Sequence, residues 1–250
     1  MNIFEDDVIK TIDMEQFEKL FDDDVKSVAN AVRKYGFDLR VVGGAVRDFL
    51  LGKKPRDIDF ATNADPAELI LIFDLEGIAY DAKGISHGTV KAVFGDEKVD
   101  VTSITYKLDV VDGKMLVNRS EGWEADAANR DLTINSMSLD MDGNIHDYVN
   151  GLDDLKGNVL RFNPSQYQKF RKDPNILMRW FKALGYFDNP RWPRKDYTAI
   201  IDNLHLLEKV KDDPKTEKTL GSIISNQDGR RILGMMCKMG AGKYLDIDCI

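Results

Sequence analysis

Cysteines and long apolar runs are scarce in this sequence, and each scarcity excludes a class of protein. Two cysteines among 250 residues are too few for a disulfide framework. Cys237 and Cys249 also lack the paired spacing of a zinc site, so we expect two reduced thiols in the core or tail. No stretch reaches the roughly 20 continuous apolar residues that a membrane span needs, so we expect no membrane partner.

A secretory signal is also lacking, because residues 1–24 are acidic and do not run from basic to apolar. We read this segment as an acidic, helical leader and expect a cytoplasmic protein. Hydrophobic residues at 43% and charged residues at 31% are typical of globular proteins. The length is sufficient for one large domain, or for a catalytic domain and a smaller helical one.

The net charge of −8 is unevenly distributed along the chain. Residues 165–250 hold 16 Lys and Arg against 11 Asp and Glu, a net charge of +5, whereas residues 1–164 carry a net charge of −13. A basic segment suits phosphate contacts, and an acidic one suits metal ligands. The alternative, that both values describe solvated surface only, stays open at this point.

The spacing of apolar residues predicts a mixed sheet flanked by helices, followed by a mostly helical part, which is an α+β fold. Glycines separate several of the expected elements, and residues 95–97 form a hairpin turn. Helices are expected over residues 25–35 and 45–51, in a segment that follows the capping residues 62–66 and ends at residue 73, and over most of the chain after residue 125. Strands are expected over residues 39–42, 56–60, 89–94 and 98–104, with a short β-like stretch at 143–148.

Asp57 and Asp59 are the strongest candidates for chemistry. With 43 acids in 250 residues, an acid-x-acid pair alone is weak evidence, but this pair falls on an expected strand. Residues two apart on a strand point to the same face, so both carboxylates would converge on one small volume. A hard cation such as Mg²⁺, which prefers oxygen ligands, relieves their repulsion.

Gly43 and Gly44 precede this pair and join a strand to a helix. Glycine lets backbone N–H groups approach an anion, and a helix N-terminus favours negative charge, so this turn can cradle a triphosphate. Asp100, on the strand over residues 98–104, would supply a third carboxylate. Three acids around two ions would fit the two-metal scheme of phosphoryl transfer.

Several motifs resemble a known family when they are read in order. GGAVRDFLLG at 43–52, followed by RDIDFAT at 56–62, closely resembles the head-domain signature of class II tRNA nucleotidyltransferases, the CCA-adding enzymes, and of the related bacterial poly(A) polymerases. VDVT at 99–102, RDLTINSM at 130–137 and residues 146–161 resemble later motifs of that family in the same order. The resemblance implies a nucleotidyltransferase head over 25–148, a helical neck over 149–200 and a short helical body over 201–250.

The resemblance also implies roles for individual residues. Asp57 and Asp59 would hold Mg²⁺ with help from Asp100, so that CMP or AMP is transferred from CTP or ATP to an RNA 3′-hydroxyl, with tRNA as the expected acceptor. Contacts to the incoming nucleotide are implied for Gly43, Gly44, Arg47, Arg130, Asp131, Asn135, Asp173 and Arg179.

One stretch departs from the family pattern. In the family, an E-D-x-x-R template in the neck reads the base edge of CTP or ATP. Here Asp173 is kept, but Lys172 and Ile176 replace the glutamate and the arginine, and an aliphatic side chain has no donors for a base. Arg179 lies on the same expected helical face and would substitute. We therefore expect Ile176→Arg to change the preference between CTP and ATP.

The acceptor RNA is expected to bind the basic C-terminal part, where cations alternate with the rings of Tyr167, Phe170, Trp180 and Trp192. Three other functions stay open from the sequence: tailing of other RNA ends, RNA binding without catalysis, and nucleotide transfer to a metabolite or protein. A homo-oligomer is also left open. The cations expected to contact RNA are Lys169, Arg171, Lys172, Lys182, Arg191, Arg194 and Lys195.

Overall fold

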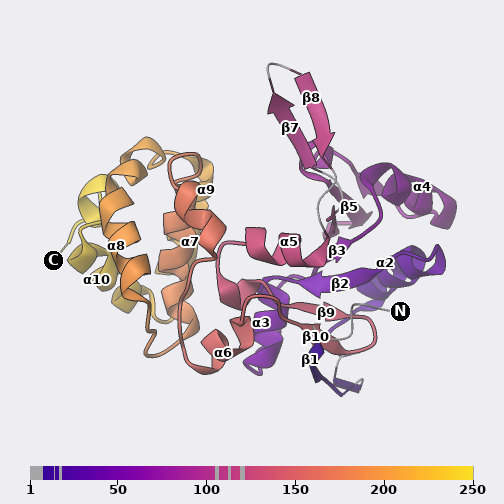
Figure 1. Cartoon of the computed structure of the whole chain (residues 1–250), viewed down its shortest axis with the longest axis horizontal. Coiled ribbons are helices and arrows are strands. Elements are labelled where there is room, and N and C mark those ends of the chain that lie inside the picture. Colours follow the sequence, from indigo (N-terminus) through magenta and orange to yellow (C-terminus); the bar gives the residue numbers. More distant parts are fainter. Residues whose placement is uncertain are drawn as a thin grey trace. The chain divides into compact units, whose positions relative to one another are not determined.

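The computed structural model describes residues 8–13, 15–16, 19–104, 107–111, 114–118 and 122–249 (Figure 1). Contacts between residues divide the chain into two compact units. We call residues 1–128 and 135–149 the head unit, and residues 129–134 and 150–250 the helical unit. Residues 129–134 thus group with the helices, although the sequence analysis assigned them to the head. The finer division into neck and body stays a prediction.

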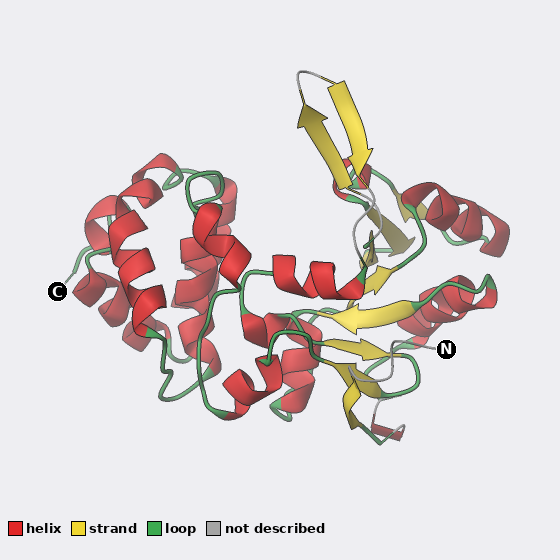
Figure 2. Ribbon diagram, viewed as in Figure 1, coloured by secondary structure: helices red, strands yellow, loops and turns green. Residues whose placement is uncertain are grey.

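The head unit is built on an eight-stranded sheet in the order β1-β10-β9-β2-β3-β6-β5-β4. Figure 2 draws the strands as yellow arrows. Of the pairs in this sheet, β3 and β6 run parallel, so the sheet is mixed, as the hairpin and strand patterns predicted. Two further strands, β7 (Lys107–Val111) and β8 (Lys114–Asn118), form a separate hairpin. The sheet strands are β1 (Val8–Thr11), β2 (Leu39–Val42), β3 (Asp59–Thr62), β4 (Tyr80–Asp81), β5 (Thr89–Phe94), β6 (Glu97–Ser103), β9 (Ser138–Asp140) and β10 (Asn144–His146).

Helices α2 (Asp23–Lys34) and α4 (Pro66–Glu76) pack on each other and on the sheet. Each begins where an aspartate accepts hydrogen bonds from backbone N–H groups of the first turn: Asp22 accepts from Val25 N, and Asp65 forms a capping box with Glu68. Two short elements complete the head unit: α3 (Gly44–Leu50) and η1 (Ile85–His87). Helix α5 (Trp123–Asn129) and the turn η2 (Thr133–Asn135) lie where the chain passes between the two units.

The helical unit contains five α-helices and four 3₁₀ turns within its described residues. Its core is aromatic: the Phe162 ring lies 5.2 Å from that of Phe170, and the Trp180 ring lies 5.5 Å from those of Phe181 and Trp192. The helices are α6 (Gly151–Lys156), α7 (Asn175–Ala183), α8 (Arg194–Asn203), α9 (Pro214–Ile224) and α10 (Gly229–Met239); the turns are η3 (Pro164–Gln168), η4 (Leu184–Tyr186), η5 (Leu204–Lys209) and η6 (Gly242–Tyr244).

Two expectations about packing were wrong. Phe170 and Trp180 are 1% and 0% exposed, so neither ring is available to stack on an RNA base. The rings are buried because removing their apolar surface from water stabilises the fold. The leader also contains a strand, since β1 pairs with β10 at the edge of the sheet. The rest of the expected helix over 1–24 lies partly outside the described residues. No described helix is both long and apolar enough to cross a membrane.

The cysteines differ from the expectation as well, because Cys237 and Cys249 form a disulfide. Cys237 lies in the last turn of α10, and the turn η6 reverses the chain so that Cys249 returns to it. Gly242 permits this approach: a Cβ atom there would lie 2.3 Å from the Cys249 Sγ atom. The two cysteines are twelve positions apart in the sequence, and no motif in that interval signals the reversal.

Candidate functional site

In the head unit, strand register brings the glycine turn and two of the expected acids to one end of the sheet. Val42, the last residue of β2, pairs with Asp59, the first residue of β3. Asp59 in turn pairs with Asp100 in the parallel β3–β6 ladder. Register partners on adjacent strands point to the same face, so the Asp59 and Asp100 side chains project together beside Gly43. Gly43 has φ +75° and ψ −135°, a conformation that only glycine adopts readily.

Asp57 lies differently from the expectation. The strand begins at Asp59 rather than at residue 56, and Asp57 occupies a bend before it. The alternation argument for the pair therefore does not apply. The Asp57 side chain is 80% exposed, with Arg56 Nε 3.9 Å from its Oδ2 atom, an exposed contact of little energetic weight. Its carboxylate is accessible to solvent and to any ligand that reaches the strand end.

Asp100 has a partner that the sequence analysis missed. Lys91, its register partner on β5, forms an ion pair with the Asp100 Oδ2 atom. The pairing of β5 with β6 was expected, but the sequence does not give the register that sets Lys91 opposite Asp100. Within the described part of the chain, no group of three or more His, Cys, Asp or Glu side chains is arranged to hold a metal ion. A three-acid cluster is therefore not preformed.

The donors at the strand end nevertheless fit a hard cation. Asp59 is exposed and Asp57 is almost fully so, and both supply carboxylate oxygens, the ligands that Mg²⁺ prefers. The third acid, Asp100, has its negative charge offset by Lys91.

Arg47, which was expected to contact a triphosphate, is 5% exposed. Its guanidinium donates to Asn135 Oδ1 at 2.5 Å and to Asp48 Oδ1 at 2.7 and 2.9 Å. It lies directly under the turn: a Cβ atom on Gly44 would be 3.2 Å from Arg47 Nη2. In this structure Arg47 and Asn135 hold the start of α3 in place, and nucleotide contacts from them stay predictions.

In the helical unit, the segment 129–134 is fixed by buried polar side chains that the sequence analysis did not single out. Asn163 Nδ2 donates to the Arg130 carbonyl at 2.7 Å, and Gln166 Nε2 donates to the Asn129 carbonyl at 2.8 Å. Both amides are almost fully buried. Their pattern matches no motif, and only the tertiary structure shows that they set the position of Arg130 and Asp131.

Arg179 joins two of the expected nucleotide contacts. Its Nε atom forms a close ion pair with Asp131, and its Nη2 atom donates to Asp173 Oδ2 at 2.7 Å. Desolvation opposes the charge, yet Asp131 and Asp173 together raise the pKa of the guanidinium above its ordinary value. The sequence suggested that Arg179 reaches the position of the missing arginine. The structure shows that it bridges the two carboxylates.

Ile176, at the position of the family's templating arginine, points into the core. It is 1% exposed, whereas Lys172 lies at the surface. An arginine at 176 would place a charge among apolar side chains, at a cost of several kcal/mol. The variant expected to change nucleotide preference would therefore disturb folding first.

The cations expected to contact RNA are not equivalent. Lys169 donates to Asn129, and Arg191 donates to the Gly157 carbonyl. Lys195 lies 4.1 Å from the centre of the Tyr167 ring. Surface positions are found for Arg171, Lys172, Lys182, Arg191, Arg194 and Lys195, whereas Lys169 is half-buried.

Comparison with known proteins gives consistent matches. The poly A polymerase head domain matches residues 39–161. The CCA tRNA nucleotidyltransferase 1, mitochondrial, of Danio rerio is 41% identical over 234 residues, 92% of this chain and 54% of that protein. The CCA-adding enzyme of Lactococcus lactis subsp. lactis is 32% identical over 225 residues, 88% of this chain and 55% of that protein.

A solved structure, the Bacillus stearothermophilus CCA-adding enzyme in complex with CTP, superimposes with a TM-score of 0.71 at 28% identity, covering 89% of this chain and 53% of that one. The chain spans about half the length of these relatives. The region matched by the poly A polymerase head domain, residues 39–161, contains the glycine turn, the acids at the strand end and the segment 129–134. The chain therefore belongs to the poly A polymerase head-domain family, the family of the class II tRNA nucleotidyltransferases.

Proposed function

We propose that this chain is a template-independent RNA 3′-end nucleotidyltransferase that adds or repairs CCA, wholly or in part, on tRNA from CTP and ATP. The observation that carries the proposal is the sheet register, which sets Asp59 and Asp100 side by side next to the Gly43–Gly44 turn. Two similar proteins are named CCA tRNA nucleotidyltransferase 1 and CCA-adding enzyme, which supports tRNA as the acceptor.

In this proposal Asp57 and Asp59 hold Mg²⁺, with Asp100 as a helper. The bound ions would supply charge neutralisation for the triphosphate and for the departing pyrophosphate. The backbone N–H groups of the turn at Gly43 would orient the triphosphate, and Arg47 and Asn135 would keep that turn in position. The protein's part in phosphoryl transfer is thus mainly positioning.

Nucleotide selection would fall to the helical unit. We assign the base edge to Asp173 and Arg179, because the carboxylate accepts from an exocyclic amine and the guanidinium donates to a ring nitrogen. Their mutual hydrogen bond of 2.7 Å keeps both groups next to each other. Arg130 and Asp131 would hold the phosphate and ribose of the same nucleotide.

Tailing of other RNA ends is the alternative that one observation favours. Arg179 is shared between two carboxylates, and Ile176 is buried, so the residues that count and choose nucleotides in the family pattern are altered. Such an enzyme would extend many RNAs with ATP without stopping. The cytoplasmic location stays a proposal too, since some relatives are named as mitochondrial.

One assay separates these functions. The full chain is incubated with Mg²⁺, labelled CTP or ATP, and a tRNA that lacks its terminal nucleotides. Addition that stops after a fixed number of nucleotides supports CCA addition, and open-ended extension with ATP on unrelated RNAs supports tailing. No incorporation into any RNA would refute both.

A further inference from the structure

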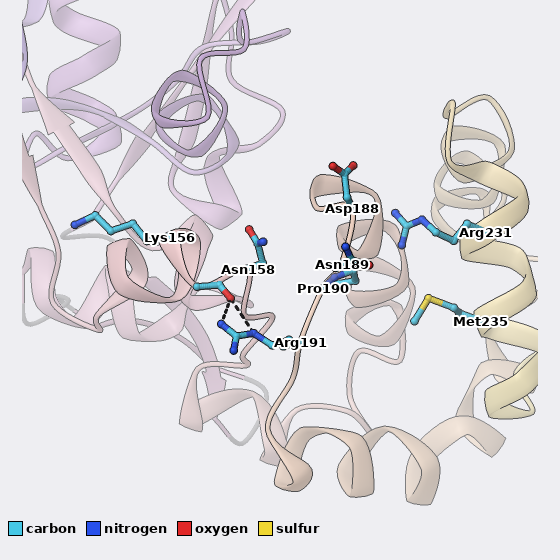
Figure 3. A pocket seen from close by; sticks show the side chains of 9 residues that line it. Lys156, Asn158, Asp188, Asn189, Pro190, Arg191, Arg231 and Met235 are labelled. Carbon is cyan, nitrogen blue, oxygen red and sulfur yellow. Dashed lines mark hydrogen bonds between the residues drawn. The ribbon is translucent and has the colours of Figure 1, made fainter.

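A pocket of about 540 Å³ in the helical unit is lined by cations that do not converge. Figure 3 shows the Lys156 ammonium pointing away from Arg191 and Asp188. Arg231 of the same pocket is paired with Asp228, whose Oδ1 atom lies 3.3 Å from Arg231 Nε. The pocket therefore carries no defined anion site. In the head unit, by contrast, one lysine points directly at a carboxylate of the strand end.

Four charged residues form a row across the sheet of the head unit, on the face that carries the strand end. Strand register places Asp59 of β3 beside Asp100 of β6. Lys91 of β5 lies opposite Asp100, and its other register partner is Asp81 of β4. Adjacent strands are about 4.8 Å apart, and register partners point to the same face. Lys91 thus has an acid on either side.

Of its two acidic neighbours, Lys91 pairs with the one that belongs to the strand end. Its Nζ atom forms a close ion pair with Asp100 Oδ2, and the two side chains are 35% and 32% exposed. Asp81 has other partners: its Oδ1 atom accepts from the Lys83 backbone N–H at 3.0 Å, and Lys98 Nζ lies 3.7 Å from its Oδ2 atom. The cation of the row is therefore held on the third acid of the strand end.

This ion pair opposes metal binding at the strand end for two reasons. It occupies an oxygen of Asp100, which an ion held by Asp57 and Asp59 would use as a further ligand. The ammonium also lies within about one strand spacing of such an ion and repels it. An orienting role for Lys91 would strengthen metal binding instead. Fixing the torsions of one partly exposed side chain, however, contributes less than the repulsion of two cations at that distance costs.

We propose that Lys91 is a positioning residue that competes with divalent ions for Asp100 and so lowers the metal affinity of the strand end in the absence of nucleotide. The inference rests on the proposed function and deepens it. Ions would then load mainly together with the triphosphate, whose oxygens supply further ligands. The displaced ammonium would keep a carboxylate nearby, because Asp81 is its register partner on the other side.

The test measures Mn²⁺ binding to the full chain without nucleotide, from the electron paramagnetic resonance signal of the free ion. Lys91→Met keeps the length of the side chain and removes its charge. We expect it to bind Mn²⁺ about tenfold more tightly than the wild-type chain, because one repelling cation is lost. Lys91→Arg keeps the charge and should show no gain. Lys26→Met, at an exposed lysine of α2, is the matched control and should also show none.

Two further variants locate the effect. Asp59→Asn should remove the Mn²⁺ binding that responds to Lys91, which assigns that binding to the strand end. In an Asp100→Asn background, Lys91→Met should change the affinity by less than about twofold, since the two residues are coupled. A full tenfold gain in that background would mean that Lys91 acts through space and not through Asp100, and would overturn the proposal.

Equal Mn²⁺ affinity of Lys91→Met and the wild-type chain would overturn it too, as would an equal gain in Lys91→Arg. Melting curves recorded without metal verify that each variant is folded. Incorporation of labelled CTP into a tRNA that lacks its terminal nucleotides is measured separately on the wild-type chain. Its absence would refute the proposed function and leave the metal measurement valid, whereas incorporation without a Lys91 effect on Mn²⁺ would refute only this inference.

Discussion

Asp59 in the head unit and the pair Asp131 and Asp173 in the helical unit are positioned in different ways. In the head unit, Asp59 is placed by backbone pairing of three strands, and its side chain is exposed. In the helical unit, Asp131 and Asp173 are held by their own side chains, through Arg179. The register of the sheet sets the position of residue 59 independently of its side chain. The arrangement of Asp131 and Asp173 depends on their ion pairs with Arg179.

Because of this difference, substitutions in the two units should affect catalysis and folding stability differently. Removing a carboxylate from the strand end should affect the reaction and leave the fold intact, because β3 keeps its ladder hydrogen bonds. Removing Arg179 should affect the fold as well, because two like charges would be left facing each other. Each of the following variants can break or sharpen this contrast.

The largest effect is expected for Asp59→Asn, which keeps the volume of the side chain and removes a charge that would hold Mg²⁺. Incorporation should fall by at least about 10³-fold, which corresponds to about 4 kcal/mol of transition-state stabilisation. The melting temperature should not change. Asp96→Asn, an exposed acid in the turn between β5 and β6, is the matched control. Wild-type incorporation by Asp59→Asn would remove the strand end from the mechanism.

Ile176→Arg should be the most damaging change to the helical unit. A charge in place of a side chain that is 1% exposed costs about 3–5 kcal/mol unless it finds a partner. Urea unfolding followed by tryptophan fluorescence measures the loss, with Ile176→Val, expected at about 0.5–1.5 kcal/mol, as the control. A stable Ile176→Arg protein with a new CTP preference would show instead that α7 can rotate its template face outward.

Arg179→Gln should lower stability less than Ile176→Arg does, and it should also change nucleotide selection. The loss of hydrogen bonds to charged groups costs about 1.5–3 kcal/mol, reduced here because the side chain is 38% exposed. The ratio of CTP to ATP incorporation should also change if Asp173 and Arg179 read the base. Arg179→Lys, which keeps the charge but not the fork, separates the two effects. A lower melting temperature with an unchanged ratio would leave Arg179 a purely structural residue.

Local signals were sufficient for most of the head unit. Capping residues such as Asp65 and the glycine turn at residue 43 identified helices and strand ends that the structure confirms. Pairing over long distances was not available from such signals: the ladder between β1 and β10 joins residues more than 130 apart, and Asp100 meets Lys91 only through the register. Ile176 was aligned by motif alone, and its burial depends on how α7 packs.

Asp140 tests the contrast in a different way, because it lies in the head unit but is held by side-chain contacts. We expect the effect of its substitution on activity to be the smallest of the series. Burial alone would raise its pKa, but hydrogen bonds from His146 Nε2 at 2.9 Å and from the Asn144 backbone and side chain at 2.8 and 3.0 Å lower the pKa from 3.8 to about 2. A depressed pKa stabilises the folded state above pH 3.8, and this stabilisation is lost as the pH falls toward 2. It amounts to roughly 2 kcal/mol.

The Asp140→Asn variant should therefore unfold at lower urea than the wild-type chain at pH 5, and the gap should narrow steadily below pH 4. Because Asp140 and its partners connect β9 to β10, which in turn pairs with β1, the loss should reach the edge of the sheet and not the strand end at Asp59. Hydrogen exchange at pH 5 can locate it. If the difference in urea midpoint between the two proteins stayed constant down to pH 2, the charge of the Asp140 carboxylate would not contribute to stability. The head unit would then depend on backbone pairing and not on this charge.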